Sequence, residues 1–218
     1  MNAISTSFSR IYHISEYTTC LLSKYSNLTK ENYVLGSGII NNFWQSWNNF
    51  WRSFWLTYLL GGSDLKRETV NPLPVLIGKS EKEAIHYVLF LLGKRTNPNG
   101  RIRGSFQEPT WGDLDVILKI ANLSFPPSTD ISTISIKLLS AFNVLGNTPK
   151  HFQLVRNCAI HLDVDTILVV KNDVLPHYAI RNFKYPTEIL FSKEIHTRKV
   201  AYQHWIDELL AVIKIIYI

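Results

Sequence analysis

Apolar side chains recur at helical spacing along most of this chain, and the clearest case lies in its first third. There, tryptophans follow one another at intervals of three and four residues: Trp44, Trp47, Trp51 and Trp55. Such intervals place side chains on one face of a helix, so the run predicts a helix with a wide aromatic face. Glycines at 36, 38, 61 and 62 bracket the run, as expected where a helix begins and ends.

This tryptophan stripe has two interpretations. Aromatic rings on a surface serve as stacking platforms for bases or as a belt at a membrane interface. Because all four indoles share one helical stripe, we favour a face buried in the core or in a subunit interface. The pattern does not decide between core and interface.

Further helices follow from the same periodicity and from capping signals. Helices are expected over residues 5–26, over 81–92 behind the capping box Ser80-x-x-Glu83, behind a second capping box Thr110-x-x-Asp113, over 131–142, and over 195–216. Another begins near Pro149, with Thr148 as its N-cap. The segment VDTILVVKNDV is helix or strand, and TEILFS is a candidate short strand. The chain therefore predicts one domain over residues 1–218, a mainly α-helical bundle with at most a short strand excursion near its C-terminal third.

Charge adds a preference for an anionic partner. Lysine and arginine outnumber the acids 23 to 17, which gives a formal net charge of +6. Four of these cations fall in the glycine- and asparagine-rich stretch 93–109, namely Lys94, Arg95, Arg101 and Arg103. This loop is either an RNA-contacting arm or an ordinary surface loop.

Several other classes of protein are disfavoured by the sequence. Cys20 and Cys158 are too few for a disulfide framework or a metal cage, which favours a reducing cytosol. The C-terminal LLAVIKIIYI has about half the length needed to span a bilayer, so we expect no membrane association. Histidine spacing matches no metal motif, and no P-loop or dinucleotide fingerprint is present. We therefore expect neither metal nor cofactor.

Candidate chemistry is concentrated in RNCAIH, residues 156–161, on the helix expected after Pro149. Residues 152, 155, 159 and 162 are apolar and predict one buried stripe, while Gln153, Asn157 and His161 stack at intervals of four. Arg156 and His161 are five residues apart, roughly 140° around the helix axis. They meet only if the arginine side chain folds back toward the imidazole. Otherwise the three polar residues of RNCAIH form a solvated helix face.

The stretch LVRNCAIH resembles the signature of the HEPN family, Arg-x(4 to 6)-His with a polar residue, often asparagine, directly after the arginine. The resemblance covers about fifteen residues closely and the rest of the chain only in its helical architecture. It implies a HEPN-like helical domain and a metal-independent ribonuclease site, formed where the motif helices of two subunits meet. It also implies a prokaryotic toxin or phage-defence setting in the cytoplasm.

The resemblance suggests a role for each motif residue. His161 would transfer protons between the ribose 2′-hydroxyl and the leaving 5′-oxygen, because imidazole titrates near neutrality. Arg156 would stabilise the charge that develops on the phosphate, and Asn157 would orient imidazole or substrate. Asp163 stands where some family branches carry a tyrosine that is modified, so control by that modification is not expected here. Asp163 is either a solvated carboxylate or a group that tunes His161.

The sequence thus predicts an endoribonuclease that acts as a homodimer on RNA, with transfer RNA suggested by analogy and an antitoxin or other regulatory protein as a further partner. A catalytically inactive HEPN-like module that binds RNA or nucleotides is the alternative. A dimerisation protein with the tryptophan stripe as its interface is the third hypothesis.

Overall fold

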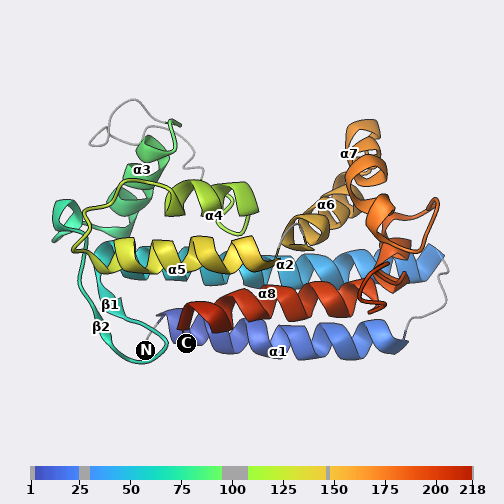
Figure 1. Ribbon diagram of the computed structural model, residues 1–218, viewed down its shortest axis with the longest axis horizontal. Helices are drawn as coiled ribbons and strands as arrows, with labels where there is room; N and C mark the ends of the chain where they lie inside the picture. Colours follow the sequence, from blue (N-terminus) through green and yellow to red (C-terminus); the bar gives the residue numbers. More distant parts are fainter. Residues whose placement is uncertain (1–2, 25–29, 95–107, 146–147, 218) are drawn as a thin grey trace. The chain divides into compact units, whose positions relative to one another are not determined.

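The computed structural model describes residues 3–24, 30–94, 108–145 and 148–217, and it is mainly α-helical, as predicted (Figure 1). The chain divides into two compact units. Unit 1 comprises Met1–Arg10, Trp47–Val144 and Lys214–Ile218, and unit 2 comprises Ile11–Ser46 and Leu145–Ile213. Helices α1 (Ala3–Lys24), α2 (Lys30–Leu60) and α8 (Ala201–Tyr217) each contribute several residues to both units, and α5 (Asp130–Leu145) contributes only its last residue, Leu145, to unit 2. The expectation of a single domain over 1–218 stays a prediction.

Unit 1 is built around the aromatic C-terminal half of α2. It adds the two-residue strands β1 (Gly62–Ser63) and β2 (Thr69–Val70), η1 (Pro74–Leu76), α3 (Glu81–Leu91), α4 (Leu114–Ala121) and α5 (Asp130–Leu145). The strands pair antiparallel, with Gly62 opposite Val70. At the end of α2, Gly61 has φ +83°, a conformation that disfavours any side chain.

Indole rings form the core of unit 1. Trp47, Trp51 and Trp55 are at most 1% exposed, and Trp51 contacts Phe54 edge to face at 5.1 Å between ring centroids. Trp44, the fourth member of the stripe, is buried in unit 2. The core interpretation of the tryptophan stripe is therefore confirmed, and these buried side chains are not available as an interface.

Polar contacts tie the segment before α4 to α2 within unit 1. The Arg52 guanidinium donates to both carboxylate oxygens of Glu108, from Nε at 2.7 Å and from Nη2 at 3.0 Å. The Trp47 indole donates to the Gly112 carbonyl at 2.9 Å, and the Gly112 N–H donates to Asn48 Oδ1 at 2.7 Å. Because these groups are buried or half-buried, the bonds hold the segment at a fixed distance from α2.

Unit 2 holds the predicted motif. Besides parts of α1, α2 and α8, it contains α6 (Thr148–His161), α7 (Val164–Val169), the π-helical turn η2 (Val170–Val174), η3 (Leu175–His177) and η4 (Pro186–Phe191). Helix α6 lies across the N-terminal half of α2 and contacts α7, η2 and η4 (Figure 1). Within the described residues its only strand-like pairs are isolated bridges, Tyr178 with Glu194 and Lys193 with Val200.

Several local expectations are confirmed and others are wrong. The capping box Ser80–Glu83 is present at the start of α3. The second box is not, because Asp113 rather than Thr110 caps α4 and accepts a bond from the Asp115 N–H. Helix α2 begins before both Gly36 and Gly38, and α8 begins six residues later than 195, after an irregular stretch.

The ambiguous C-terminal segments proved helical. VDTILVVKNDV forms α7 and η2, and TEILFS falls mainly in the 3-10 helix η4, so the predicted strand excursion is absent from the described residues of that region. Thr148 lies inside α6 rather than before it, and the two residues that precede it are outside the described residues. Most of the basic loop 93–109 also lies outside them.

Candidate functional site

Helix α6 buries one face against α2 and exposes its C-terminal end. Phe152, Val155 and Ala159 are buried, as the predicted stripe requires, and Phe152 contacts Trp44 at 5.9 Å between ring centroids. Leu162 was expected to complete the stripe, but it is 49% exposed. It lies just past the end of α6 with φ +47°, so the helical spacing no longer applies to it.

Arg156 is half-buried and is held by uncharged partners. Its guanidinium donates to Asn41 Oδ1 from Nε at 3.1 Å and from Nη2 at 2.6 Å, and its carbon Cζ lies 5.9 Å from the centre of the Trp44 ring. Within the described residues no carboxylate pairs with it. Burial lowers the pKa of Arg156 from its usual value, yet the group stays charged. The result is an oriented cation without a counter-ion.

Asn157 lies beside this cation. Its side-chain oxygen accepts a bond from Arg156 Nη1 at 3.0 Å, so the guanidinium is bound by an amide on each side. Two of the three predicted site residues are thus brought together. Asn41, which sequence reasoning missed, completes the arrangement from a position 115 residues away in the chain.

His161 is the last residue of α6 and is exposed. In the part of the chain that the structure describes, no hydrogen bond or ion pair joins it to Arg156. Apolar side chains that flank it in the sequence or belong to α7 are also exposed, by between 38% and 71%: Ile160, Leu162, Val164, Leu168 and Val169. One chain therefore presents the imidazole to solvent, and the residues after it carry exposed apolar side chains together with the exposed acids Asp163 and Asp165.

Asp163 has a structural role next to His161. As the N-cap of α7 its carboxylate accepts a bond from the Thr166 N–H at 2.8 Å, and this bond is the main cause that lowers the pKa of Asp163. The residue is solvent-exposed, which agrees with the interpretation of Asp163 as a solvated carboxylate.

A second group of titratable side chains lines a cavity of about 290 Å³ at the other end of α6. Four of the seven histidines of the chain converge there: His151, His177, His196 and His204. They come from α6, η3, the segment before α8 and α8, so no local spacing announced them. Within the described residues, no three potential ligands are placed to hold a metal ion.

The buried member of this histidine cavity is neutral. Tyr178 Oη accepts a bond from the Trp205 indole and shares a second bond with His151 Nδ1 at 3.1 Å. Burial, reinforced by the neighbouring histidines, lowers the pKa of His151 to about 4. His151 is therefore uncharged near neutral pH, and the cavity is also lined by the buried Glu194.

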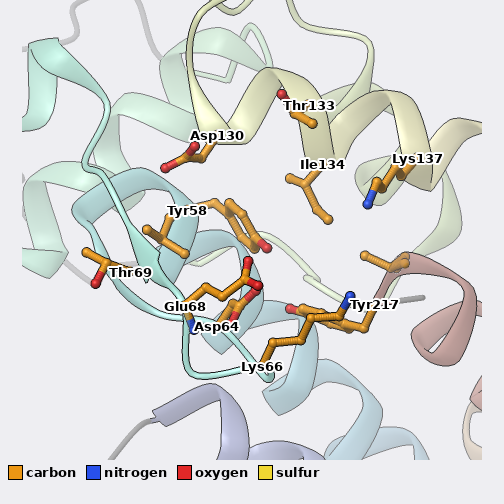
Figure 2. A pocket seen from close by; sticks show the side chains of 12 residues that line it. Tyr58, Asp64, Lys66, Glu68, Thr69, Asp130, Thr133, Ile134, Lys137 and Tyr217 are labelled. Carbon is orange, nitrogen blue, oxygen red and sulfur yellow. Dashed lines mark hydrogen bonds between the residues drawn. The ribbon is translucent and has the colours of Figure 1, made fainter.

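Unit 1 has a hollow of its own, of about 180 Å³, beside the strands (Figure 2). Asp64 and Asp130, on its wall, accept bonds from the backbone N–H groups of Glu68 and Asn71, which fixes the loop between and after the strands. Burial raises the pKa of Tyr58 to about 12. Lysines and acids line the hollow together, so its charges favour no particular ligand class.

Comparison with models of protein families, with curated proteins and with solved structures found no match to the chain. Among the described helices none is long and apolar enough to cross a membrane. The candidate site therefore rests on its own geometry and on the resemblance of LVRNCAIH to the HEPN signature.

Proposed function

We propose that the protein is a metal-independent endoribonuclease whose site consists of Arg156, Asn157 and His161. The observation that carries the proposal is the environment of Arg156. A half-buried guanidinium that is oriented by Asn41 and Asn157 and has no carboxylate partner within the described residues keeps its full charge for an anion. Arginine is well suited to phosphate because its planar fork of donors matches the phosphate oxygens.

In this mechanism the three side chains divide the work. The imidazole of His161 accepts the proton of a ribose 2′-hydroxyl as the oxygen attacks the adjacent phosphorus, and a second imidazole returns a proton to the departing 5′-oxygen. The products are a 2′,3′-cyclic phosphate and a free 5′-hydroxyl. Arg156 stabilises the additional negative charge on the phosphate oxygens, and Asn157 keeps the guanidinium in place.

A second copy of the chain would complete the site. Within one chain Arg156 is held against α2 while His161 is exposed at the helix end, and the exposed apolar side chains that flank His161 in the sequence or belong to α7 suit a surface that another subunit covers. A twofold arrangement would bring in the partner's imidazole and guanidinium. Action as a toxin or phage-defence effector in the cytoplasm, cleavage of transfer RNA, and control by an antitoxin belong to the same proposal and rest on the family resemblance alone.

The alternative is a HEPN-like module that binds RNA or nucleotides without cutting. The lack of a bond between Arg156 and His161 in one chain favours it, because a monomer would have an anion-binding guanidinium without an adjacent general base.

The test is incubation of purified protein with total RNA in the presence of a chelator, with wild type beside His161→Ala and Arg156→Lys. Arg156→Lys keeps the charge but loses the planar fork. His13→Ala, which removes an exposed histidine on α1, is the matched control. We expect cleavage that survives chelation, is lost in both motif variants and persists in the control. Binding without cleavage by wild type would select the alternative, and undiminished cleavage by His161→Ala would end the proposed mechanism. Sedimentation of wild type as a monomer would contradict the composite site.

A further inference from the structure

An aromatic pair lies directly against the motif helix in unit 2. Tyr33 of α2 and Tyr185, which precedes η4, stack with 4.8 Å between ring centroids and 27° between ring planes. The Tyr33 hydroxyl donates to the Ala159 carbonyl at 3.2 Å, which ties the pair to α6 between Arg156 and His161. Both tyrosines are half-buried rather than enclosed in the core.

Lys184 adds a positive charge to this pair. Its ammonium lies 5.4 Å from the centre of the Tyr185 ring. The carboxylate of Glu188 is occupied by the backbone N–H groups of Lys184 and Tyr185, at 3.2 Å and 2.9 Å. No salt bridge to the Lys184 ammonium is found within the described residues.

A groove of about 560 Å³ lies in the same segment of unit 2. Lys171 and Arg181 supply its charge, Asn182 adds an amide, and Leu175, Pro176 and Ile180 line it with apolar surface. Lys171 belongs to η2, which packs on α6. Both cations are exposed and, like Lys184, have no carboxylate partner in the described part of the chain. Asp173, the acid nearest in sequence to Lys171, is exposed and does not line the groove.

We propose that these features form the binding track for the RNA strand next to the cleaved bond, and that the strand is single-stranded. This inference deepens the proposed function and rests on it. An unpaired base packs on the tyrosine pair. The exposed Lys184 ammonium then leaves the face of the Tyr185 ring and contacts a phosphate of the strand. Lys171 and Arg181 contact phosphates further along. Only an unpaired base offers its flat face to a tyrosine, so the track selects loops and single strands over a continuous duplex.

Binding of a 2′-O-methyl oligonucleotide tests the track without cleavage, because the methyl group removes the attacking hydroxyl. A 12-nucleotide single strand and a blunt-ended duplex of 12 base pairs, which has no loop, are titrated at several salt concentrations. The groove variant carries the double substitution Lys171→Gln/Arg181→Gln. The charge-matched control, Lys82→Gln/Lys119→Gln, removes two exposed lysines of unit 1. Loss of two phosphate contacts is expected to reduce the slope of log affinity against log salt by about 1.4, whereas the control leaves it unchanged.

The tyrosine pair is tested separately with Tyr185→Leu and Tyr185→Phe. Phenylalanine keeps a ring and is expected to retain single-strand affinity, while leucine lowers it about tenfold. An unchanged salt slope in the groove variant, equal effects in both double variants, or a preference of wild type for the duplex would overturn the track. No binding of the single strand by wild type would overturn it as well.

The two proposals fail in different ways. If wild type never cleaves RNA but the groove variant loses salt-dependent binding, the nuclease is wrong and the track remains as a site for single strands. If cleavage depends on Arg156 and His161 while the groove and tyrosine variants bind and cleave as wild type does, the nuclease stands and the track is wrong.

Discussion

Asn41→Asp is the sharpest test of the idea that Arg156 is kept free for an anion. The amide oxygen of Asn41 accepts two bonds from the guanidinium, at 3.1 and 2.6 Å. A carboxylate has almost the same shape and accepts the same two bonds, but it also brings a negative charge. The substitution therefore preserves the contact and changes only whether the cation has a counter-ion.

The magnitude follows from the geometry. Two opposite unit charges about 4 Å apart attract by about 4 kcal/mol at an effective dielectric constant of about 20. Because Arg156 is only half-buried, solvent screening and the desolvation of the new carboxylate reduce the net gain in folding stability to about 1 kcal/mol. A phosphate would then meet a neutral pair instead of a cation. Loss of one charge-assisted interaction, about 2 kcal/mol, corresponds to a decrease in kcat/KM of about 30-fold.

The assay measures both quantities on the same preparations. Urea unfolding gives the free energy of unfolding, and cleavage of a labelled RNA gives kcat/KM. Asn42→Asp adds the same charge at the next position of α2, where the side chain is exposed, and is expected to leave both values near those of wild type. If Asn41→Asp cuts RNA as fast as wild type, or loses activity only together with stability, then Arg156 does not act as an anion-binding cation.

Two further predictions concern stability. For His151 the folded pKa of about 4 lies below the ordinary 6.5, so the unfolded chain takes up the proton first. The free energy of unfolding is expected to fall by about 3 kcal/mol more in wild type than in His151→Gln as the pH drops from 6.5 to 4, and parallel pH profiles would contradict the neutral histidine. Gly112→Ala is expected to lose about 2 kcal/mol by thermal unfolding, because the new Cβ would lie 2.5 Å from Trp47 Cδ1. Gly38→Ala meets nothing within 4 Å inside α2 and is expected to gain about 0.5 kcal/mol, so equal effects of the two alanines would refute the steric account.

Periodicity predicted the helices well because each long helix of this chain buries one face. The tryptophans of α2 repeat at intervals of three and four, and their side chains are fully or almost fully buried. Capping chemistry is equally local, which is why Ser80 with Glu83 marked the start of α3 correctly. Thr110 matched the same sequence rule but failed, since Asp113 three residues later has a carboxylate that caps the helix directly.

Local patterns left the structure of residues 164–174 open between helix and strand. Residues 164–174 are rich in β-branched side chains, yet they form α7 and η2, which pack on α6. None of the residues of α7 is buried, so the apolar content that suggested a strand does not mark a core segment. Helix α6 packs on η2, where Val174 is buried far along the chain from α6. This packing outweighs the weak local preference of β-branched residues for a strand.

The candidate site shows the same division between local and distant information. Sequence spacing identified Arg156, Asn157 and His161, all within six residues. It could not identify Asn41, because the bond to Arg156 depends on how α6 lies across α2. The four histidines of the cavity were individually visible but lie at irregular spacing between positions 151 and 204, so only the fold brings them together.

The three polar residues that share one line of α6 differ in burial, which bears on how the motif could form an active site. Gln153, Asn157 and His161 share one line on the helix at intervals of four, which suggested equivalent positions on a polar face. In the structure Gln153 is 4% exposed, Asn157 is half-buried and His161 is exposed. Burial thus decreases along this line from Gln153 to His161. Arg156 is held beside the half-buried Asn157, whereas His161 is exposed at the C-terminal end of α6. Under the proposed composite site, catalysis by this motif and association of two chains should be lost together when the exposed apolar residues that flank His161 in the sequence and those of α7 are made polar.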